Sequence, residues 1–122
     1  MPDQEHMKGA LQRYVDGFNA GDAAAVSALF ADDAVVEDPV GHPQVVGREA
    51  IDAFYANAVG AGTKLSLDGP IRGSYGDRAA MAFTVAVPGM GLRIRVIDVM
   101  TFGADGRIVR MEAHWGPDDL EG

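Results

Sequence analysis

The segment LRIRVIDVMTF, which spans Leu92–Phe102, decides the fold class of this chain. It is rich in β-branched residues, which favour extended backbone, and it predicts a strand. Alternate residues of a strand face the same side, and the even-numbered residues from 92 to 102 are all apolar except Asp98. The odd-numbered set begins with Arg93 and Arg95, so we expect the even-numbered face to point into the interior.

Asp98 therefore places a carboxyl group among apolar side chains. Burial of an ionised carboxylate is costly, and the usual response is a raised pKa and a neutral acid. A buried carboxyl group can also accept structural hydrogen bonds, and a bulge in the strand could turn the side chain outward. Periodicity alone leaves these interpretations open.

Further strands are predicted on both sides of this segment. They span residues 34–38, 64–68, 71–75, 79–87 and 107–115. The first is expected to end before Pro39, because proline has no N–H group to donate to a strand ladder. Residues 103–106 form a glycine-bounded tight turn that leads into the last strand.

The first half of the chain predicts three helices. Helical spacing relates Met7, Leu11, Tyr14, Val15 and Phe18. Asp3 is the expected N-cap of this helix and Gly21 its expected end, while Asp22 caps a short second helix. A third helix is expected over residues 47–59. Three helices followed by a run of strands predict an α+β fold, with the helices packed on one face of a strongly curved, mostly antiparallel sheet.

The composition narrows the function classes. A chain of 122 residues with 48% hydrophobic and 23% charged residues is expected to form one globular domain, residues 1–122. No cysteine is present, which excludes disulfides, thiolate metal sites and cysteine nucleophiles. The net charge of −8 argues against nucleic acid and anionic membranes as partners. The opening MPDQEHMKGA has no signal-peptide pattern and no long apolar run follows, so a cytoplasmic location is expected.

Two further residues are candidates for chemistry. Asp38 shares a strand face with Ala34 and Val36, which could make it a partly desolvated base, although an aspartate before a turn often binds nearby backbone groups. Tyr14 lies on the apolar stripe of the first helix, where a tyrosine is ordinarily a core residue whose hydroxyl has found a partner. The three histidines lack metal-ligand spacing, so no metal site is expected.

Six segments resemble the bacterial Δ5-3-ketosteroid isomerases. They are QRYV at 12–15, ALFADDAVVEDPVG at 28–41, AFYAN at 53–57, AFTV at 82–85, VIDVMTF at 96–102 and GRIVRMEAHWG at 106–116. The similarity follows nearly the whole chain in order, without large insertions. It implies a cone-shaped α+β fold of the SnoaL-like, nuclear-transport-factor-like superfamily, a homodimer, and one deep apolar cavity in each subunit.

The resemblance also implies roles for single residues. The family's general base falls on Asp38, and its oxyanion hole falls on the Tyr14 phenol and a protonated Asp98. Tyr55 matches a tyrosine that supports the phenol through a hydrogen bond, while Phe30 replaces a second supporting tyrosine of some members. Neither a metal nor an organic cofactor is expected, and the expected substrate is a small-molecule steroid.

The fused rings of a steroid need an apolar lining. The residues expected to supply it are Val40, Phe54, Phe83, Val85, Val87, Met100, Met111, Ala113 and Trp115. Stripes of this kind also arise from plain core packing, which periodicity does not distinguish from a cavity wall. Residues 87–92 depart most from the family pattern, near the expected cavity mouth.

Two other kinds of function fit the same fold. One is another enzyme, such as a polyketide cyclase or an epoxide hydrolase, because a fold does not determine a reaction. An Asp-Arg-Asp hydrolase would need an arginine on the cavity face, whereas Arg93 and Arg95 are predicted to face away. The other is a non-catalytic apolar-ligand carrier or dimerisation module, which would bind a steroid without converting it.

Overall fold

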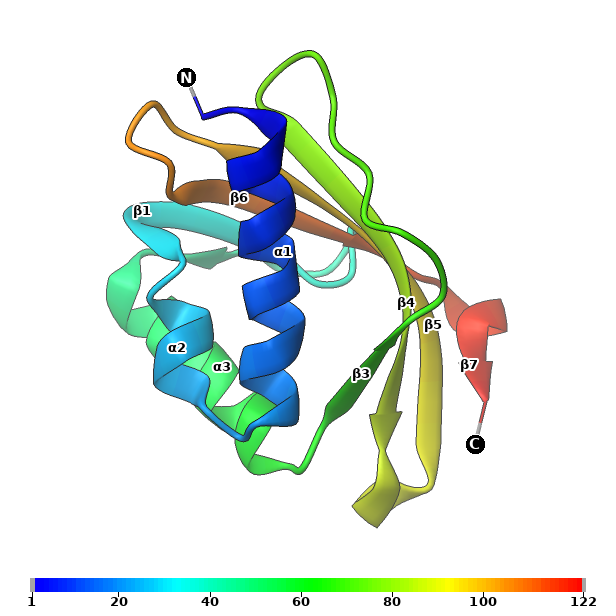
Figure 1. Ribbon diagram of the computed structural model, residues 1–122. Coiled ribbons are helices and arrows are strands. Elements are labelled where there is room, and N and C mark those ends of the chain that lie inside the picture. Colours follow the sequence, from blue (N-terminus) through cyan, green and yellow to red (C-terminus); the bar gives the residue numbers. More distant parts are fainter. Residues whose placement is uncertain (1, 122) are drawn as a thin grey trace.

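The computed structural model describes residues 2–121, which form three helices and a seven-stranded sheet (Figure 1). The helices are α1 (Gln4–Asn19), α2 (Ala23–Ser27) and α3 (Arg48–Gly60). The strands are β1 (Phe30–Glu37), β2 (Val45–Val46), β3 (Lys64–Leu67), β4 (Arg78–Val87), β5 (Leu92–Phe102), β6 (Ile108–His114) and β7 (Leu120–Glu121). Short 3-10 turns cover Pro88–Met90 and Pro117–Asp119. The predicted α+β fold class is confirmed.

The helix ends follow from local chemistry. The Asp3 carboxylate accepts a hydrogen bond from the backbone N–H of His6, and Asp22 caps α2 in the same way through Ala25. Each cap satisfies one of the N–H groups that a helix start leaves without a partner. Gly21, at φ +71°, lies in the left-handed region and reverses the chain between α1 and α2. The predicted starts of α1 and α2 and the predicted end of α1 are confirmed to within two residues, whereas α2 ends at Ser27, three residues before the expected end at Phe30.

The strands form one mixed sheet in the order β2-β1-β6-β5-β4-β3, with β7 added beside β5. All pairs are antiparallel except β1 with β6. The strand predicted at 71–75 is wrong, because only Arg72 pairs there, in a single bridge with Ala80. Ser74 turns the chain at that point, since its hydroxyl donates to the Arg78 carbonyl and accepts from the Gly76 N–H.

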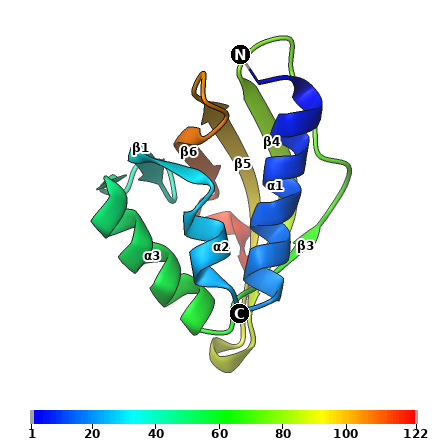
Figure 2. The ribbon, with the colours of Figure 1, turned by 60° about the vertical axis from the view of Figure 1, so that its left-hand side comes forward.

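The three helices lie on one side of the curved sheet, and the space between the two layers holds the core (Figures 1 and 2). On β5, the even-numbered residues Val96, Asp98, Met100 and Phe102 are buried, whereas Arg93, Arg95 and Ile97 are exposed. The period-two prediction for this strand is therefore confirmed, and the carboxyl group of Asp98 faces the helices. Among the described residues, no helix is long and apolar enough to cross a membrane.

Candidate active site

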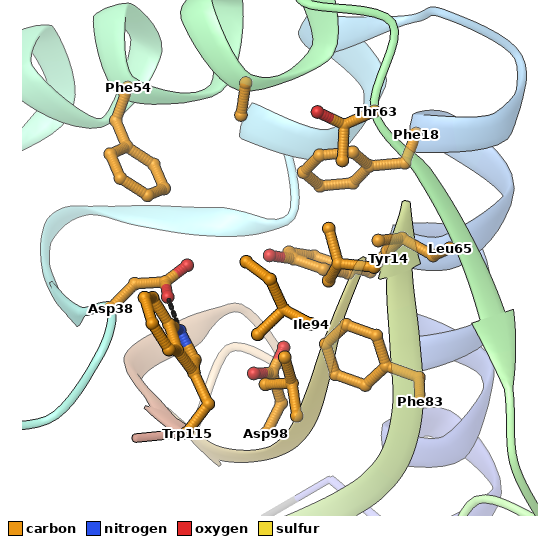
Figure 3. A pocket seen from close by; sticks show the side chains of 13 residues that line it. Tyr14, Phe18, Asp38, Phe54, Thr63, Leu65, Phe83, Ile94, Asp98 and Trp115 are labelled. Atoms are coloured by element: carbon orange, nitrogen blue, oxygen red, sulfur yellow. Dashed lines mark hydrogen bonds between the residues drawn. The ribbon is translucent and has the colours of Figure 1, made fainter. Parts of the chain in front are cut away.

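A pocket opens between the helical layer and the concave face of β3, β4 and β5 (Figure 3). Most of its wall is apolar. The lining residues are Tyr14, Phe18, Asp38, Phe54, Ala58, Thr63, Leu65, Phe83, Val85, Ile94, Val96, Asp98 and Trp115. The three residues singled out for chemistry, Tyr14, Asp38 and Asp98, come from α1, the end of β1 and the middle of β5, and the fold brings them to this one pocket.

Asp98 lies on a strand that is paired on both sides, and it has no polar partner among the described residues. Its strand pairs with Met81 of β4 on one side and Ala113 of β6 on the other, and the residue is 1% exposed. Neither carboxyl oxygen has a hydrogen-bond partner among the described residues. Burial raises the pKa of Asp98 well above its usual value, and the nearby charge of Asp38 raises it further. This side chain is therefore suited to remain a neutral acid and to donate a hydrogen bond to a ligand.

This raised pKa makes the stability of the fold depend on pH. The folded protein retains the Asp98 proton to a higher pH than the unfolded chain does, so stability contributed by this proton is fully present in acid. It is lost as the pH rises from the ordinary aspartate range through the raised pKa. We expect the unfolding free energy of the wild type to fall over this window, and that of Asp98→Asn to fall less. Urea unfolding followed at a series of pH values measures both, and equal slopes would contradict a buried neutral acid.

Tyr14 is a phenol buried among aromatic rings. It is 3% exposed, and its ring packs against Phe18, Phe30 and Tyr55. Its hydroxyl donates to the hydroxyl of Tyr55 across 3.2 Å. Burial raises the pKa of Tyr14 well above its usual value, which keeps the phenol protonated at neutral pH. Because hydroxyl groups rotate, Tyr14 can turn its proton to a ligand while Tyr55 donates to Tyr14 in return.

Asp38 has a different environment from Asp98. It follows directly after β1, and the indole N–H of Trp115 donates to its carboxylate across 3.0 Å. Burial raises the pKa of Asp38, while the Trp115 hydrogen bond and the nearby His42 lower it and so oppose the effect of burial. Asp98 has no such donor, and its pKa is raised well above the ordinary value. The pKa of Asp38 is thus raised less than that of Asp98, so Asp38 is the more readily ionised of the two carboxyl groups in this pocket.

The apolar lining predicted from the sequence matches the structure in part. Phe54, Phe83, Val85 and Trp115 line the pocket. Met100, Met111 and Ala113 lie instead in the closed core with Met7 and Leu11, because α1 covers that part of the sheet face. Val87 is buried but lies outside the lining, and Val40 is 44% exposed in the turn after β1.

Six lining residues were not singled out from the sequence. They are Phe18, Ala58, Thr63, Leu65, Ile94 and Val96. For most of them a signal was present. Phe18 and Ala58 each follow a site residue by one helical turn, and Ile94 and Val96 share the face of Asp98. Thr63 had no such signal, because it lies in the link between α3 and β3.

The chain is similar to known proteins over nearly all its length. Residues 11–111 match the family model of the SnoaL-like domain. A steroid Delta-isomerase of Nocardioides simplex is 41% identical, and the match covers 93% of each chain. The epoxide hydrolase LasB of Streptomyces lasalocidi is 34% identical over 98% of this chain but only 44% of its own length.

Proposed function

This chain belongs to the SnoaL-like family and, within it, to the steroid Delta-isomerases, and from this premise we propose that it converts 3-oxo-Δ5-steroids to 3-oxo-Δ4-steroids. The observation that carries the proposal is the unpartnered, buried carboxyl group of Asp98, which lines the same pocket as the Tyr14 phenol and the Asp38 carboxylate. Two hydrogen-bond donors and one base around an apolar space are a set suited to the enolisation of a ketone.

The first step is removal of a proton from C4 of the steroid. This proton is only weakly acidic, and its removal places negative charge on the C3 oxygen. Asp38 is the proposed base, and Tyr14 with protonated Asp98 form the proposed oxyanion hole. Donors that are already oriented in a site with little water stabilise the developing charge better than mobile water does, because they need no reorganisation during the step.

The second step returns the same proton to C6. Asp38, now protonated, remains over the same steroid face and delivers the proton to the other end of the dienolate, so the double bond moves into conjugation. The C3 oxygen regains its carbonyl form and both donors keep their own protons. Tyr55 supports the step by donating to the Tyr14 oxygen while Tyr14 donates to the substrate.

Appearance of the conjugated ketone is the direct test of this function. A Δ5-3-ketosteroid is mixed with the protein, and the rise in ultraviolet absorbance of the Δ4 product is followed. Rapid conversion by the wild type is expected. A folded protein that binds the steroid without converting it would be the apolar-ligand carrier that the sequence also allowed, and the isomerase proposal would fail.

The similarity to an epoxide hydrolase makes hydrolysis the second candidate reaction. Among the described residues that line the pocket there is no arginine, and Arg93 and Arg95 are exposed on the other face of β5. The charged partner that an Asp-Arg-Asp hydrolase needs is thus missing from this lining, which favours isomerisation.

We also propose that the protein is a homodimer, which light scattering in solution tests.

Replacing Trp115 by Phe is expected to shift the acid limb of the pH–rate profile to higher pH. The substitution keeps an aromatic wall but removes the N–H group that donates to Asp38 and lowers its pKa. Because Asp38 must be ionised to act as a base, activity is lost on the acid side at a higher pH than in the wild type. On the acid limb we expect about a tenfold lower kcat/KM than in the wild type at the same pH, in keeping with loss of a hydrogen bond to a charged group. An unmoved acid limb would exclude this role for Trp115.

A further inference from the structure

The turn that follows β1 places His42 near the proposed base. The backbone N–H of Val40 donates to the Ala113 carbonyl across 2.9 Å, and the backbone N–H of His42 donates to the Pro39 carbonyl across 3.0 Å. The first bond fixes the turn to the end of β6, two residues before Trp115, and the second fixes His42 within the turn. The position of His42 relative to Trp115 is therefore set by the backbone.

The imidazole ring of His42 packs against the residue that holds the base. Its edge meets the indole of Trp115 in a T-shaped arrangement, with the ring centroids 6.5 Å apart and the planes at 66°. The same indole donates its N–H to the Asp38 carboxylate across 3.0 Å (Figure 3). His42 is exposed and is not among the described residues that line the pocket, so it can exchange a proton with the solvent without touching a bound ligand.

The charge of His42 acts on Asp38. Burial raises the pKa of Asp38, whereas the Trp115 hydrogen bond and the His42 charge lower it. A nearby positive charge has this effect because it stabilises the ionised carboxylate. Of these contributions, the charge of His42 is the one that changes with pH, since a histidine ordinarily gains its proton in mildly acid solution. Acid solution is also where a carboxylate base becomes protonated and loses activity.

The other titratable groups that act together with Asp38 stay uncharged in this pH range. They come from three elements, with Tyr14 on α1, Tyr55 on α3 and Asp98 on β5. Burial raises the pKa of all three well above the usual values, so each keeps its proton in mildly acid solution. Within this group, His42 alone adds a positive charge as the pH falls.

The charged side chains on the elements beside the turn are occupied elsewhere or exposed. Glu37 at the end of β1 and Glu112 on β6 both pair with Arg110. After β6, Asp119 accepts from a backbone N–H, and Asp118 is exposed. Helix α3 contacts β2, and the charged side chains near its start are Arg48, Glu49 and Asp52. None of these groups contributes to the shift in the pKa of Asp38.

We propose that His42 is a positioning residue whose imidazolium charge, held against Trp115, keeps Asp38 ionised and the isomerase active further into the acid range. This inference rests on the proposed function and assigns to it a residue that does not touch the substrate. As the pH falls, the proton that the imidazole gains adds a positive charge, which opposes protonation of the base. The acid limb of the pH–rate profile therefore lies at a lower pH than it would with an uncharged residue at position 42.

The test compares two variants of His42 with a matched control. His42→Gln removes both the charge and the ring, whereas His42→Lys removes the ring and keeps a positive charge. His114→Gln makes the first change at an exposed position of β6, opposite Ile97 on the outer face of the sheet. For each protein, kcat/KM is measured from mildly alkaline pH down through the acid limb.

On the acid limb, we expect the kcat/KM of His42→Gln to be about twofold to fivefold below that of the wild type at the same pH, the size of a charge interaction at an exposed site. At mildly alkaline pH the two should agree, because the imidazole is then neutral and the base is ionised. His42→Lys should keep at least the wild-type activity on the acid limb, and His114→Gln should match the wild type throughout.

Three results would overturn the proposal. An unmoved acid limb in His42→Gln would mean that the charge does not reach the base. Equal losses in His42→Gln and His42→Lys would assign the effect to the ring that packs on Trp115. A loss of the same size at every pH would mean that His42 only supports the shape of the turn.

Direct titration of Asp38 separates this proposal from the isomerase proposal. The Asp38 carboxyl carbon is followed by NMR over a series of pH values in protein with isotope-labelled aspartate, and its signal is identified by its loss in Asp38→Asn. If the wild type converts no steroid, but the titration midpoint moves to higher pH in His42→Gln and not in His42→Lys, the isomerase proposal fails and the role of His42 stands. An unmoved midpoint in His42→Gln overturns that role whatever the activity.

Discussion

Asp38→Asn is expected to lower kcat by about 10⁴-fold, the upper end of what a positioned general base contributes. The amide is nearly the same size as the carboxylate, but it is not basic and cannot carry the proton from C4 to C6. The loss should reach this upper end because both steps of the proposed reaction use the same group. KM should change little, since the amide does not enlarge or close the pocket.

The experiment needs a control for folding and one for charge. Asp33→Asn makes the same substitution at an exposed position of β1, and its activity should match the wild type. The Asp38→Asn protein should still bind the Δ4 product and unfold cooperatively in urea. Activity within tenfold of the wild type, in a protein that binds product normally, would show that Asp38 is not the base.

Asp98→Leu is expected to lower kcat by about 10²- to 10³-fold, which is the usual effect of removing one oxyanion-hole donor. Asp98→Asn should cost much less, about tenfold, because a carboxamide still donates a hydrogen bond at nearly the same place. The contrast between the two variants isolates the ability to donate, since both remove the carboxyl group. Equal losses in the two variants would contradict a neutral-donor role for Asp98.

Unfolding measurements on the same two variants test whether the loss of activity comes from a loss of stability. The Asp98 oxygens have no partner in the fold, so leucine removes an unsatisfied buried group and should not lower the free energy of unfolding. A catalytically poor but fully stable Asp98→Leu protein would tie the loss to the reaction. Severe destabilisation would mean that the carboxyl group supports the fold.

Local patterns predicted the parts of the fold that depend on nearby residues. The bounds of β5 follow from its period of two, and the starts of α1 and α2 follow from the caps Asp3 and Asp22. The start of β1 at Phe30 was missed, since Asp32 and Asp33 interrupt any apolar alternation. Strand β1 is instead stabilised by parallel pairing with β6, a contact between distant parts of the sequence.

The candidate site was predictable to a different degree in each of its parts. Asp98 stood out by physical reasoning alone, as one acid on an apolar strand face, whereas Tyr14 needed the family resemblance. The extent of the cavity was not predictable from periodicity, which identifies the inner face of a strand but not the portion that a helix covers. For this reason Met100 was expected in the wall and lies in the core, while Ile94 of the same face lines the pocket.

The register of β5 between β4 and β6 has a consequence for how such a protein can change over generations. The ladder on both sides of β5 is made by backbone groups, which every non-proline residue supplies. Substitutions at positions 94, 96 and 98 can therefore alter the shape, the polarity and the titratable groups of the pocket without breaking the backbone hydrogen bonds that hold the sheet together. New reactions can therefore arise on this scaffold through substitutions of single side chains while the strand pairing is kept.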